Sequence, residues 1–423
     1  MVFMNINLPV FESDSKELNL AWRIAVGDIV GNIKPYHAGL LEKSEPCLVA
    51  GLDYSTPWTR DTAINTCFAT AWLCPEVAKN SLLSVCVMKD GKRSISGWGQ
   101  DWDAAIWGIG AYHYLQVTND MSFLPIAKEV IRNTLDEYEK IAFDADCGLF
   151  RGPAVYGDGV AAYPDRFLTG NSGIVGCKKP MFSLSTNCMF YMAYRIAEKL
   201  KVGDYAKKAD ELKRAVNRHF WNESRKSYDY LAHECAYQEG LGISFALLSG
   251  IADGERAEEV IRSAELTPHG IACVYPSFER YTRLGGLGRH SGTIWPFIQG
   301  FWGLALKKYN RNSEFDENLR LMAEKACRDG QFSEIYHSVT GEIYGGLQED
   351  APEGKIREWK SMRRQSWSAS AFLSLIVYGL FGCGWANGAL SYEPRLPGIC
   401  KHMRIEGLPD GGKRVDISVG DRQ

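Results

Sequence analysis

Helical segments of two kinds alternate along most of this chain, and this alternation constrains the fold more than any other feature. Segments such as AKEVIRNTLDEYEKI and YAKKADELKRAVNRHF place apolar residues on one helical face and charged residues on the other. Segments such as AAIWGIGAYHYLQV and TIWPFIQGFWGLAL are apolar, or small and polar, on every face. The first kind can face water, whereas the second kind must be enclosed by protein.

The periodicity and the helix breakers predict about twelve helices and almost no convincing strand before residue 385. The predicted helices span residues 16–33, 60–74, 76–88, 101–117, 121–140, 182–201, 204–219, 238–249, 253–263, 292–308, 314–329 and 365–381. Six hairpins of an outer and an inner helix predict an all-α fold, the (α/α)6 toroid. A solenoid of helix pairs is the structural alternative, but the spacing shows no fixed period.

The length of 423 residues exceeds the ~250–300 at which one core usually stops growing, unless the fold is a large barrel. We expect residues 1–384 to form that barrel and to carry the catalytic site. Short runs broken by Pro and Gly predict that residues 385–423 form a β-rich tail packed on the barrel.

Composition excludes several classes of partner. With 48 basic and 51 acidic residues, a net charge of -3 and no long Lys/Arg block, the chain is not expected to bind nucleic acid. Its twelve cysteines form no C-x-x-C pair and are expected to be reduced and buried, with no metal site. The N-terminus lacks a secretory signal pattern, which favours a cytoplasmic location. The uncharged run from Gln365 to Glu393 is predicted to be a buried helix rather than a membrane span, because it contains several Ser and Gly residues.

Motifs for nucleotide cofactors, metal hydrolysis and serine esterase chemistry are missing from the sequence, and no cofactor is expected. In the predicted fold, every connection from an outer to an inner helix emerges at the same end. These connections hold Trp58, Trp98, Trp102, Trp295 and Trp359, together with many Tyr, Arg and carboxylate side chains. Aromatic faces and charged hydrogen-bonding groups favour an oligosaccharide or glycoside as the ligand.

Glycoside hydrolysis needs one carboxylic acid and one carboxylate. Asp158, between two glycines in apolar surroundings, is the predicted acid, because such surroundings raise a carboxyl pKa. Asp165 is the alternative, and the segment could also be a turn without chemistry. Glu334, between Phe332 and Tyr336, is the predicted base, with Glu358 and Glu342 as alternatives. Other acidic residues are expected in solvent-exposed turns or loops: Asp144, Asp146, Glu349, Asp350 and Glu353.

Several motifs resemble the six-hairpin glycosidases. They are WTRDTAI (58–64), the aspartate after an F-R-G loop, HSGTIWPFIQGFWGLA (290–305), E-I-Y-x-x-x-T-G-E (334–342) and QSWSASAFL (365–373). This group includes the trehalases, the family 63 α-glucosidases and the glucosidase part of glycogen debranching enzymes. The resemblance covers most of residues 17–385, and it implies the same acid and base, Asp158 and Glu334.

The resemblance also implies substrate-binding residues. Trp58, Arg60 and Asp61 would hold the sugar, with Gln100 and Asp101 nearby. We also place His290, Trp295 and Trp367 in this set. Simpler interpretations remain for some of them: a salt bridge at a helix N-terminus for Arg60 and Asp61, a core residue for Trp295, and loop ordering for His290.

The hypothesis from sequence is therefore an inverting, exo-acting α-glycosidase, and above all an α-glucosidase; inversion is implied by the resemblance alone. A glycoside phosphorylase or a sugar epimerase on the same fold, or a non-catalytic carbohydrate-binding protein, is the alternative. The sequence predicts neither the sugar nor the oligomeric state.

Overall fold

The computed structural model describes residues 8–95, 102–157, 159–167, 181–350 and 355–420. Its α-helices are α1 Lys16–Gly31, α2 Thr59–Asn65, α3 Ala71–Leu73, α4 Pro75–Ser84, α5 Ile106–Thr118, α6 Leu124–Ile141, α7 Leu184–Lys199, α8 Ala206–His219, α9 Gly240–Ser249, α10 Gly254–Ser263, α11 Glu279–Thr282, α12 Pro296–Lys308, α13 Asn312–Asp329 and α14 Ser366–Ser374. Two π-helical segments, η1 Thr66–Thr70 and η4 Leu375–Leu380, continue α2 and α14, and the short 3-10 helices are η2 Val160–Ala162 and η3 Asp165–Phe167.

Short strands accompany these helices. They are β1 Val10–Ser13, β2 Ile33–Tyr36, β3 Glu45–Leu48, β4 Cys86–Lys89, β5 Lys92–Ile95, β6 Phe143–Asp144, β7 Leu149–Phe150, β8 Trp221–Asn222, β9 Ser227–Tyr228, β10 Gln238–Glu239, β11 Leu266–Thr267, β12 Gly270–Ile271, β13 Val274–Tyr275, β14 Leu347–Glu349, β15 Ile356–Glu358, β16 Gly384–Ala386, β17 Ala389–Ser391, β18 His402–Asp410 and β19 Lys413–Gly420. Among the described residues they form eight two-stranded sheets and one three-stranded sheet, β1-β18-β19.

The prediction of an all-α (α/α)6 toroid is wrong. The structure is 46% helical and 19% strand, and in the described part of the chain fifteen strands, β1 to β15, precede residue 384. Most of them have two to four residues, too few for the alternating pattern that reveals a strand in a sequence. They pair as local antiparallel hairpins in the connections between helices, for example β6 with β7 and β8 with β9.

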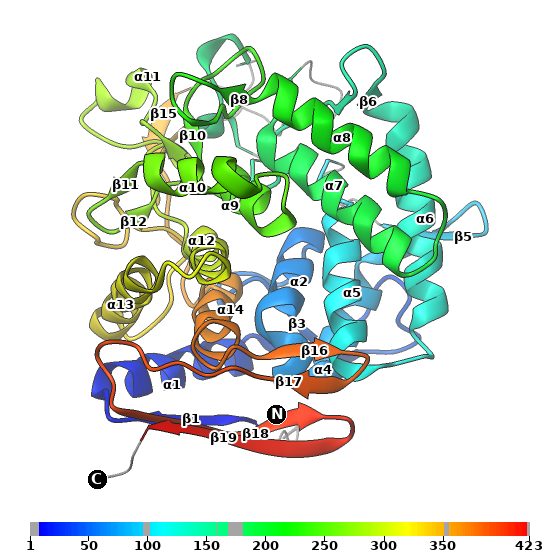
Figure 1. Cartoon of the computed structure of the whole chain (residues 1–423), viewed down its shortest axis with the longest axis vertical. Helices are drawn as coiled ribbons and strands as arrows, with labels where there is room; N and C mark the ends of the chain where they lie inside the picture. Colours follow the sequence, from blue (N-terminus) through cyan, green and yellow to red (C-terminus); the bar gives the residue numbers. More distant parts are fainter. Residues whose placement is uncertain (1–7, 96–101, 158, 168–180, 351–354, 421–423) are drawn as a thin grey trace.

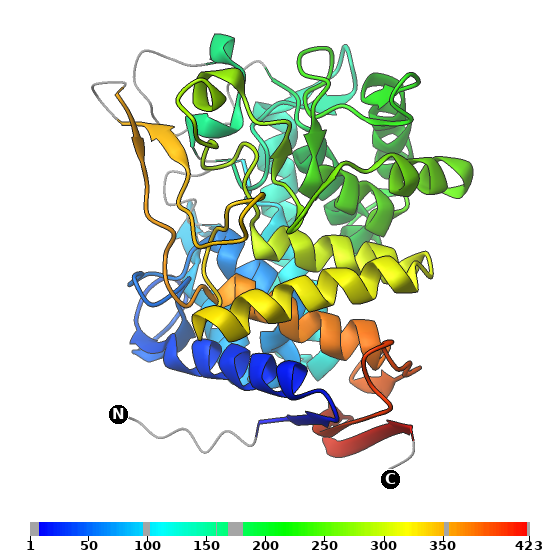
Figure 2. The ribbon, with the colours of Figure 1, turned by 90° about the vertical axis from the view of Figure 1, so that its left-hand side faces the viewer.

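The helices differ in burial as their sequences do. Helices α2, α5, α7, α9, α12 and α14 pack each against the next in this order, and α14 also contacts α2 (Figure 1). Every residue of α2 and α14 is buried. In α8, which packs on α7, only Ala209, Leu212, Ala215 and Val216 are buried, at the spacing of one helical face. Helices α1, α13 and α14 run side by side (Figure 2).

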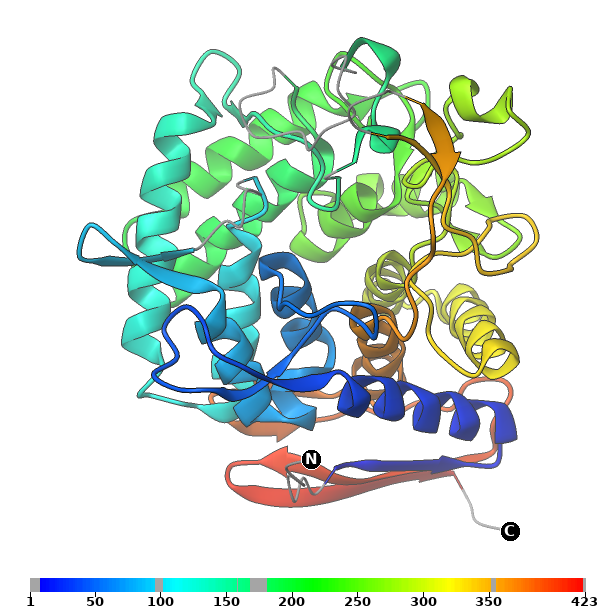
Figure 3. The ribbon, with the colours of Figure 1, turned by 180° about the vertical axis from the view of Figure 1, so that it is seen from behind.

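The three-stranded sheet joins the two ends of the described chain. Strand β1 pairs antiparallel with β18, which pairs with β19. The sheet lies at one edge of the molecule beside α1, and the same arrangement is seen from behind (Figures 1 and 3). The side chains of Phe11, Met403, Ile405 and Leu408 are buried against the helical core. No helix among the described residues is long and apolar enough to cross a bilayer.

Glycine allows close approach of α5 to α2. A Cβ built on Gly110 would lie 2.7 Å from Ala63 Cα and 3.0 Å from the Ala63 carbonyl oxygen. We expect Gly110→Ala to destabilise the protein by about 1–3 kcal/mol, although alanine favours helices. Gly27→Ala on α1 is the matched control, because nothing lies within 4 Å of its added Cβ, and should stabilise by about 0.5–1 kcal/mol. Urea unfolding measures the change in the free energy of unfolding for both variants. Equal changes for Gly110→Ala and Gly27→Ala would contradict the close approach of α5 to α2.

Candidate active site

Glu334 lies in the loop after α13, and three donors fix its carboxylate. Gly330, in the left-handed conformation (φ 64°), ends α13 and starts this loop. The Glu334 side chain is buried, with 3% of its surface exposed. Its Oε1 accepts from the Tyr54 hydroxyl at 2.9 Å, and its Oε2 accepts from Arg289 Nη2 at 2.7 Å and from the Met362 amide at 3.3 Å. The carboxylate is therefore held in one orientation by three separate chain segments.

The Tyr54 hydroxyl remains a donor to this carboxylate. Burial, followed by the negative charge of Glu334, raises the pKa of Tyr54 well above its usual range. The phenol is therefore protonated at all pH values of interest, and its proton points to Glu334. Asp61 contributes to the same rise, which places its charge near Tyr54.

Arg289 connects Glu334 to two further loops. Its Nη1 donates to the carbonyl oxygens of Gly345 and Lys360, each at 3.0 Å. Its guanidinium carbon lies 5.4 Å from the ring centroid of Trp295 and 5.7 Å from that of Trp359. The buried ion pair between Arg289 and Glu334 thus joins the connection before α12 to the connection before α14.

The predicted acid, Asp158, lies outside the described residues, but both glycines that flank it are described. The Tyr163 hydroxyl donates to the Gly157 carbonyl oxygen at 2.6 Å. On the other side, a Cβ built on Gly159 would clash with Gln348 Oε1 and lie 3.3 Å from His290 Cε1. Gly159 is therefore packed against His290, the residue next to Arg289.

Arg60, at the start of α2, links this helix to the same segment. Its Nη1 donates to the Val155 carbonyl oxygen at 2.8 Å and to Asp103 Oδ2 at 3.1 Å. The Arg60–Asp103 ion pair is buried, with 7% and 1% of the two side chains exposed. Asp61 is also buried, whereas Trp58, the residue before α2, is partly exposed. Gln100 and Asp101 lie outside the described residues.

The predicted aromatic residues form a stack beside these polar groups. The rings of Tyr156 and His290 are 5.8 Å apart, and those of His290 and Trp295 are 4.7 Å apart, both nearly parallel. Trp367 contacts Trp295 edge-on at 5.9 Å and stacks on Phe297 at 4.2 Å. Trp295 and Trp367 are each 3% exposed. The stack therefore packs on both faces of the His290 ring. Of the described aromatic residues in the predicted set, Trp58 alone is partly exposed.

The alternative carboxylates differ from Glu334 in exposure. Asp165 is exposed, with its Oδ1 2.8 Å from Arg280 Nη1, and Glu342 and Glu358 are exposed as well. The expectation of an exposed loop is wrong for Glu349, which lies buried in β14 and accepts from Arg280 Nε at 3.0 Å and from the Tyr281 hydroxyl at 2.7 Å. The sequence does not reveal this network because Arg280 is 69 positions away from Glu349.

Glu239 is a buried carboxyl that the sequence analysis missed. It lies directly before α9 with no exposed surface, and its Oε2 accepts from the Ser185 amide at 2.9 Å. The Ser185 hydroxyl in turn accepts from the Val155 amide at 3.1 Å. Burial raises the pKa of Glu239 from 4.5 to about 8. A protonated Glu239 thus supports Ser185 and, through it, the segment that leads to Asp158.

The raised pKa of Glu239 makes the stability depend on pH. Between pH 4.5 and about 8 the folded state holds a proton that the unfolded state has lost, so the free energy of unfolding falls as pH rises. We expect Glu239→Gln, which is neutral at every pH, to avoid this loss, gaining up to about 1.4 kcal/mol per pH unit relative to the wild type. Urea unfolding at several pH values measures it, with the exposed Glu255→Gln as control. Parallel curves for wild type and Glu239→Gln would contradict the raised pKa.

Within the described ranges no group of three or more His, Cys, Asp and Glu side chains is arranged to hold a metal ion. The eleven described cysteines are free, and most of them are buried. The side chains that the structure brings together at this site are carboxylates, arginines, tyrosines and tryptophans.

Part of the sequence, and the fold, are similar to those of known proteins. Residues 178–368 match the family model described as the mannosylglycerate hydrolase MGH1-like glycoside hydrolase domain. This match supports the prediction of a glycosidase. The matched stretch includes Glu334, Arg289, His290, Trp295 and Trp367, and it begins after Asp158. No curated protein sequence matches the chain.

Solved structures show the same fold at low identity. A protein described as a sialidase has a TM-score of 0.72 and 15% identity, with 98% of this chain and 38% of that chain covered. A family GH78 rhamnosidase from a Bacillus species has a TM-score of 0.65 and 15% identity, with 97% and 40% covered. An uncharacterised conserved protein from Thermus thermophilus has a TM-score of 0.56 and 15% identity, with 84% and 100% covered. The chain thus spans about two fifths of the length of the first two.

The family match supports the prediction of a glycosidase, and the structural comparisons correct the fold. The structural relatives have rhamnosidase and sialidase folds rather than a clear all-α toroid. The specific resemblance to trehalases, family 63 enzymes and debranching enzymes is not confirmed.

Proposed function

We propose that this glycosidase is an inverting, exo-acting α-glycosidase in which Glu334 is the general base and Asp158 the general acid. The observation that carries the proposal is the fixed, buried carboxylate of Glu334, which is paired with Arg289. The next residue in the chain, His290, packs against Gly159. The two segments that hold the proposed acid and base therefore meet at residues 289–290.

The proposed reaction uses both carboxyl groups in one step. Glu334 takes a proton from a water molecule as the water oxygen attacks the anomeric carbon, while Asp158 gives its proton to the leaving oxygen as that bond breaks. The products are a sugar of inverted configuration and an alcohol, and both carboxyl groups later return to their starting protonation states. A base must be aimed at its water, and the three donors to Glu334 supply a fixed orientation.

Trp58, Arg60 and Asp61 are the proposed contacts to the nonreducing sugar. Arg60 is bound to Val155 and Asp103, so α2 is fixed relative to the segment that leads to Asp158. Trp58 offers a partly exposed aromatic ring beside it. Aromatic faces of this kind stack on the C–H surface of a pyranose ring.

Two glycosides are the leading substrates. The motifs that resemble six-hairpin glycosidases favour an α-glucoside, whereas the match of residues 178–368 to the mannosylglycerate hydrolase MGH1-like domain favours mannosylglycerate. Both leading substrates belong to the class of short oligosaccharides and small glycosides.

The experiment that tests this proposal is an NMR time course with aryl α-glucoside, aryl α-mannoside, aryl α-L-rhamnoside and mannosylglycerate, without added phosphate. We expect hydrolysis of an α-glucoside or an α-mannoside, with the β-anomer of the free sugar appearing first. Release of the α-anomer first would contradict inversion. Turnover only with added phosphate would instead identify a glycoside phosphorylase, in which Glu334 has no role as base.

A further inference from the structure

A cavity of about 380 Å³ lies among the helices that pack in order around the core. Its lining includes Ile109 of α5, Ile196 of α7, Leu248 of α9 and Leu304 of α12. Trp295 precedes α12 by one residue and lies nine positions before Leu304, about 13 Å along the helix axis. None of the residues placed in the candidate active site, which is built from the N-terminal ends of α2, α12 and α14, lines this cavity.

The lining is that of a site for an apolar molecule. Most of the lining side chains are aliphatic or aromatic. Phe301, Leu304, Leu248 and Met192 are partly exposed, and all four line the cavity. Both π-helical segments border the cavity, η1 with Phe68 and η4 with Tyr378. π-helical turns occur often at functional sites. The volume lies within the usual range for small-molecule pockets.

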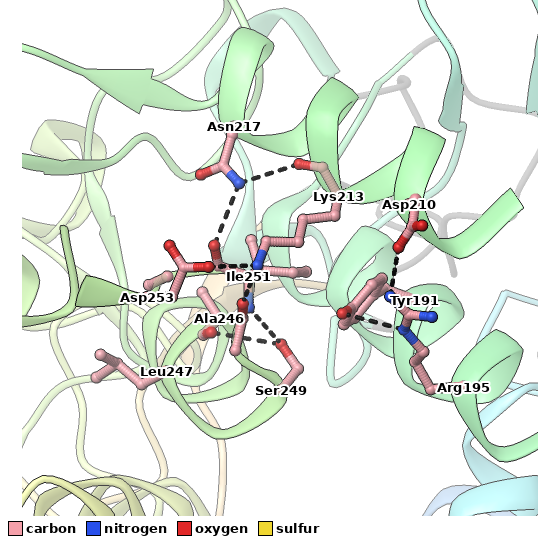
Figure 4. Close-up of polar contacts among 12 residues, drawn as sticks. Tyr191, Arg195, Asp210, Lys213, Asn217, Ala246, Leu247, Ser249, Ile251 and Asp253 are labelled. Carbon is pink, nitrogen blue, oxygen red and sulfur yellow. Dashed lines mark hydrogen bonds and ion pairs between the residues drawn. The ribbon is translucent and has the colours of Figure 1, made fainter. Parts of the chain in front are cut away.

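Polar groups gather at one end of the cavity, where α7 and α9 finish. Figure 4 shows Arg195 of α7 held by two partners: its Nε donates to the Tyr191 hydroxyl at 3.3 Å, and its guanidinium pairs with Asp210 of α8. Across from it, the Ser249 hydroxyl donates to the Ala246 carbonyl oxygen at 3.4 Å and accepts from the Ile251 amide at 3.4 Å.

The chain after α9 is tied to α8 as well. Lys213 of α8 donates to the Gly250 carbonyl oxygen at 2.7 Å and pairs with Asp253, and Asn217 donates to the Ile251 carbonyl oxygen at 3.2 Å (Figure 4). At this end of the cavity, Arg195 of α7 and the chain after α9 are thus both held by contacts to α8. Because these side chains are already ordered, less conformational entropy of the protein is lost when a ligand binds.

Lys199 leaves a positive charge at this rim. Its Nζ lies 5.4 Å from the ring centroid of Tyr112, and no carboxylate of the described residues lies within ion-pair distance of it. Arg195 differs, because Asp210 and Glu198 offset its charge. Burial, and then the charge of Lys199, lowers the pKa of His113 to about 4, so this ring, which lines the cavity, is neutral at pH 7.

We propose that this cavity is a second binding site, which takes an amphipathic monocarboxylate. The apolar body of the ligand fills the space between Ile109 and Leu304, and its carboxylate lies at the rim near Lys199 and His113. The site is independent of glycoside hydrolysis, because none of its residues belongs to the candidate active site.

Calorimetric titration of the full chain with decanoate, and separately with the uncharged decanol, tests the proposal. We expect saturable binding of decanoate at one site. Lys199→Met should weaken decanoate about tenfold and leave decanol unchanged, because a charge-assisted contact is lost. Lys207→Met, at an exposed lysine of α8 outside the lining, is the matched control and should change neither titration.

Two further variants locate the binding. Leu304→Trp, which fills the cavity, should abolish binding of both probes, and Ile109→Phe should weaken both; circular dichroism checks that the variants fold. Glu334→Gln should bind decanoate like the wild type, since the active site is not involved. No saturable binding, unchanged binding in folded Leu304→Trp, or loss of binding in Glu334→Gln would each overturn the proposal. Failure of the glycosidase proposal would leave these titrations unaffected.

Discussion

Glu334→Gln is expected to lower kcat by roughly 10²–10⁴-fold while the protein still folds. The amide has nearly the same shape as the carboxylate but cannot accept a proton from water. Its oxygen can still accept a hydrogen bond from Tyr54 or Arg289, so the loops joined by these contacts stay together. Steady-state kinetics on the preferred glycoside, with circular dichroism and thermal unfolding alongside, measures both parts of this expectation.

Glu342→Gln is the matched control for this variant. Glu342 lies in the same connection, eight positions after Glu334, but its side chain is exposed. Its replacement should leave kcat unchanged. If Glu334→Gln kept full activity, or if Glu342→Gln lost as much, Glu334 would not be the base.

Arg289→Met is expected to destabilise the protein by about 3–5 kcal/mol, because it breaks a buried ion pair and leaves the carboxylate without its charged partner. Methionine keeps an unbranched apolar side chain between Trp295 and Trp359, so most of the lost free energy reflects polar contacts. The hydrogen bonds to Gly345 and Lys360 are lost as well. Urea unfolding measures the change.

A double-mutant cycle separates the ion pair from the other contacts of Arg289. The variant with both Arg289→Met and Glu334→Gln should be less destabilised than the sum of the two single variants, since the buried negative charge is gone. Arg283→Met, at an exposed arginine paired with Glu279, is the control and should change stability by no more than about 0.5 kcal/mol. Additive effects of the two buried substitutions would show that Arg289 and Glu334 do not interact.

Sequence periodicity predicted the helices well, because long helices repeat their burial pattern over several turns. Each of the twelve predicted spans overlaps an observed helix, with ends that differ by a few residues; the span 204–219, for instance, contains α8. The all-α class failed because hairpins such as β6–β7 contain too few residues to show a period. The short helix α11 was missed for the same reason.

The candidate site was predictable in part. Glu334 stood out because aromatic residues surround it before a turn, and the structure buries it. Arg289 and Tyr54 were not predicted, although both lie in connections rich in aromatic residues. Arg289 is 45 positions from Glu334 and Tyr54 is 280 positions away, so only the tertiary fold brings them together. The role of Asp158 stays a prediction.

The most direct test of the central claim is a crystal structure of the Glu334→Gln variant with an unhydrolysed glycoside bound. We expect the carboxyl groups of residues 158 and 334 to face each other across the scissile bond, about 6.5–9.5 Å apart, with room for one water molecule at residue 334. A separation near ~5 Å would contradict inversion. Asp158 pointing away from the bound glycoside would contradict the proposed pair itself.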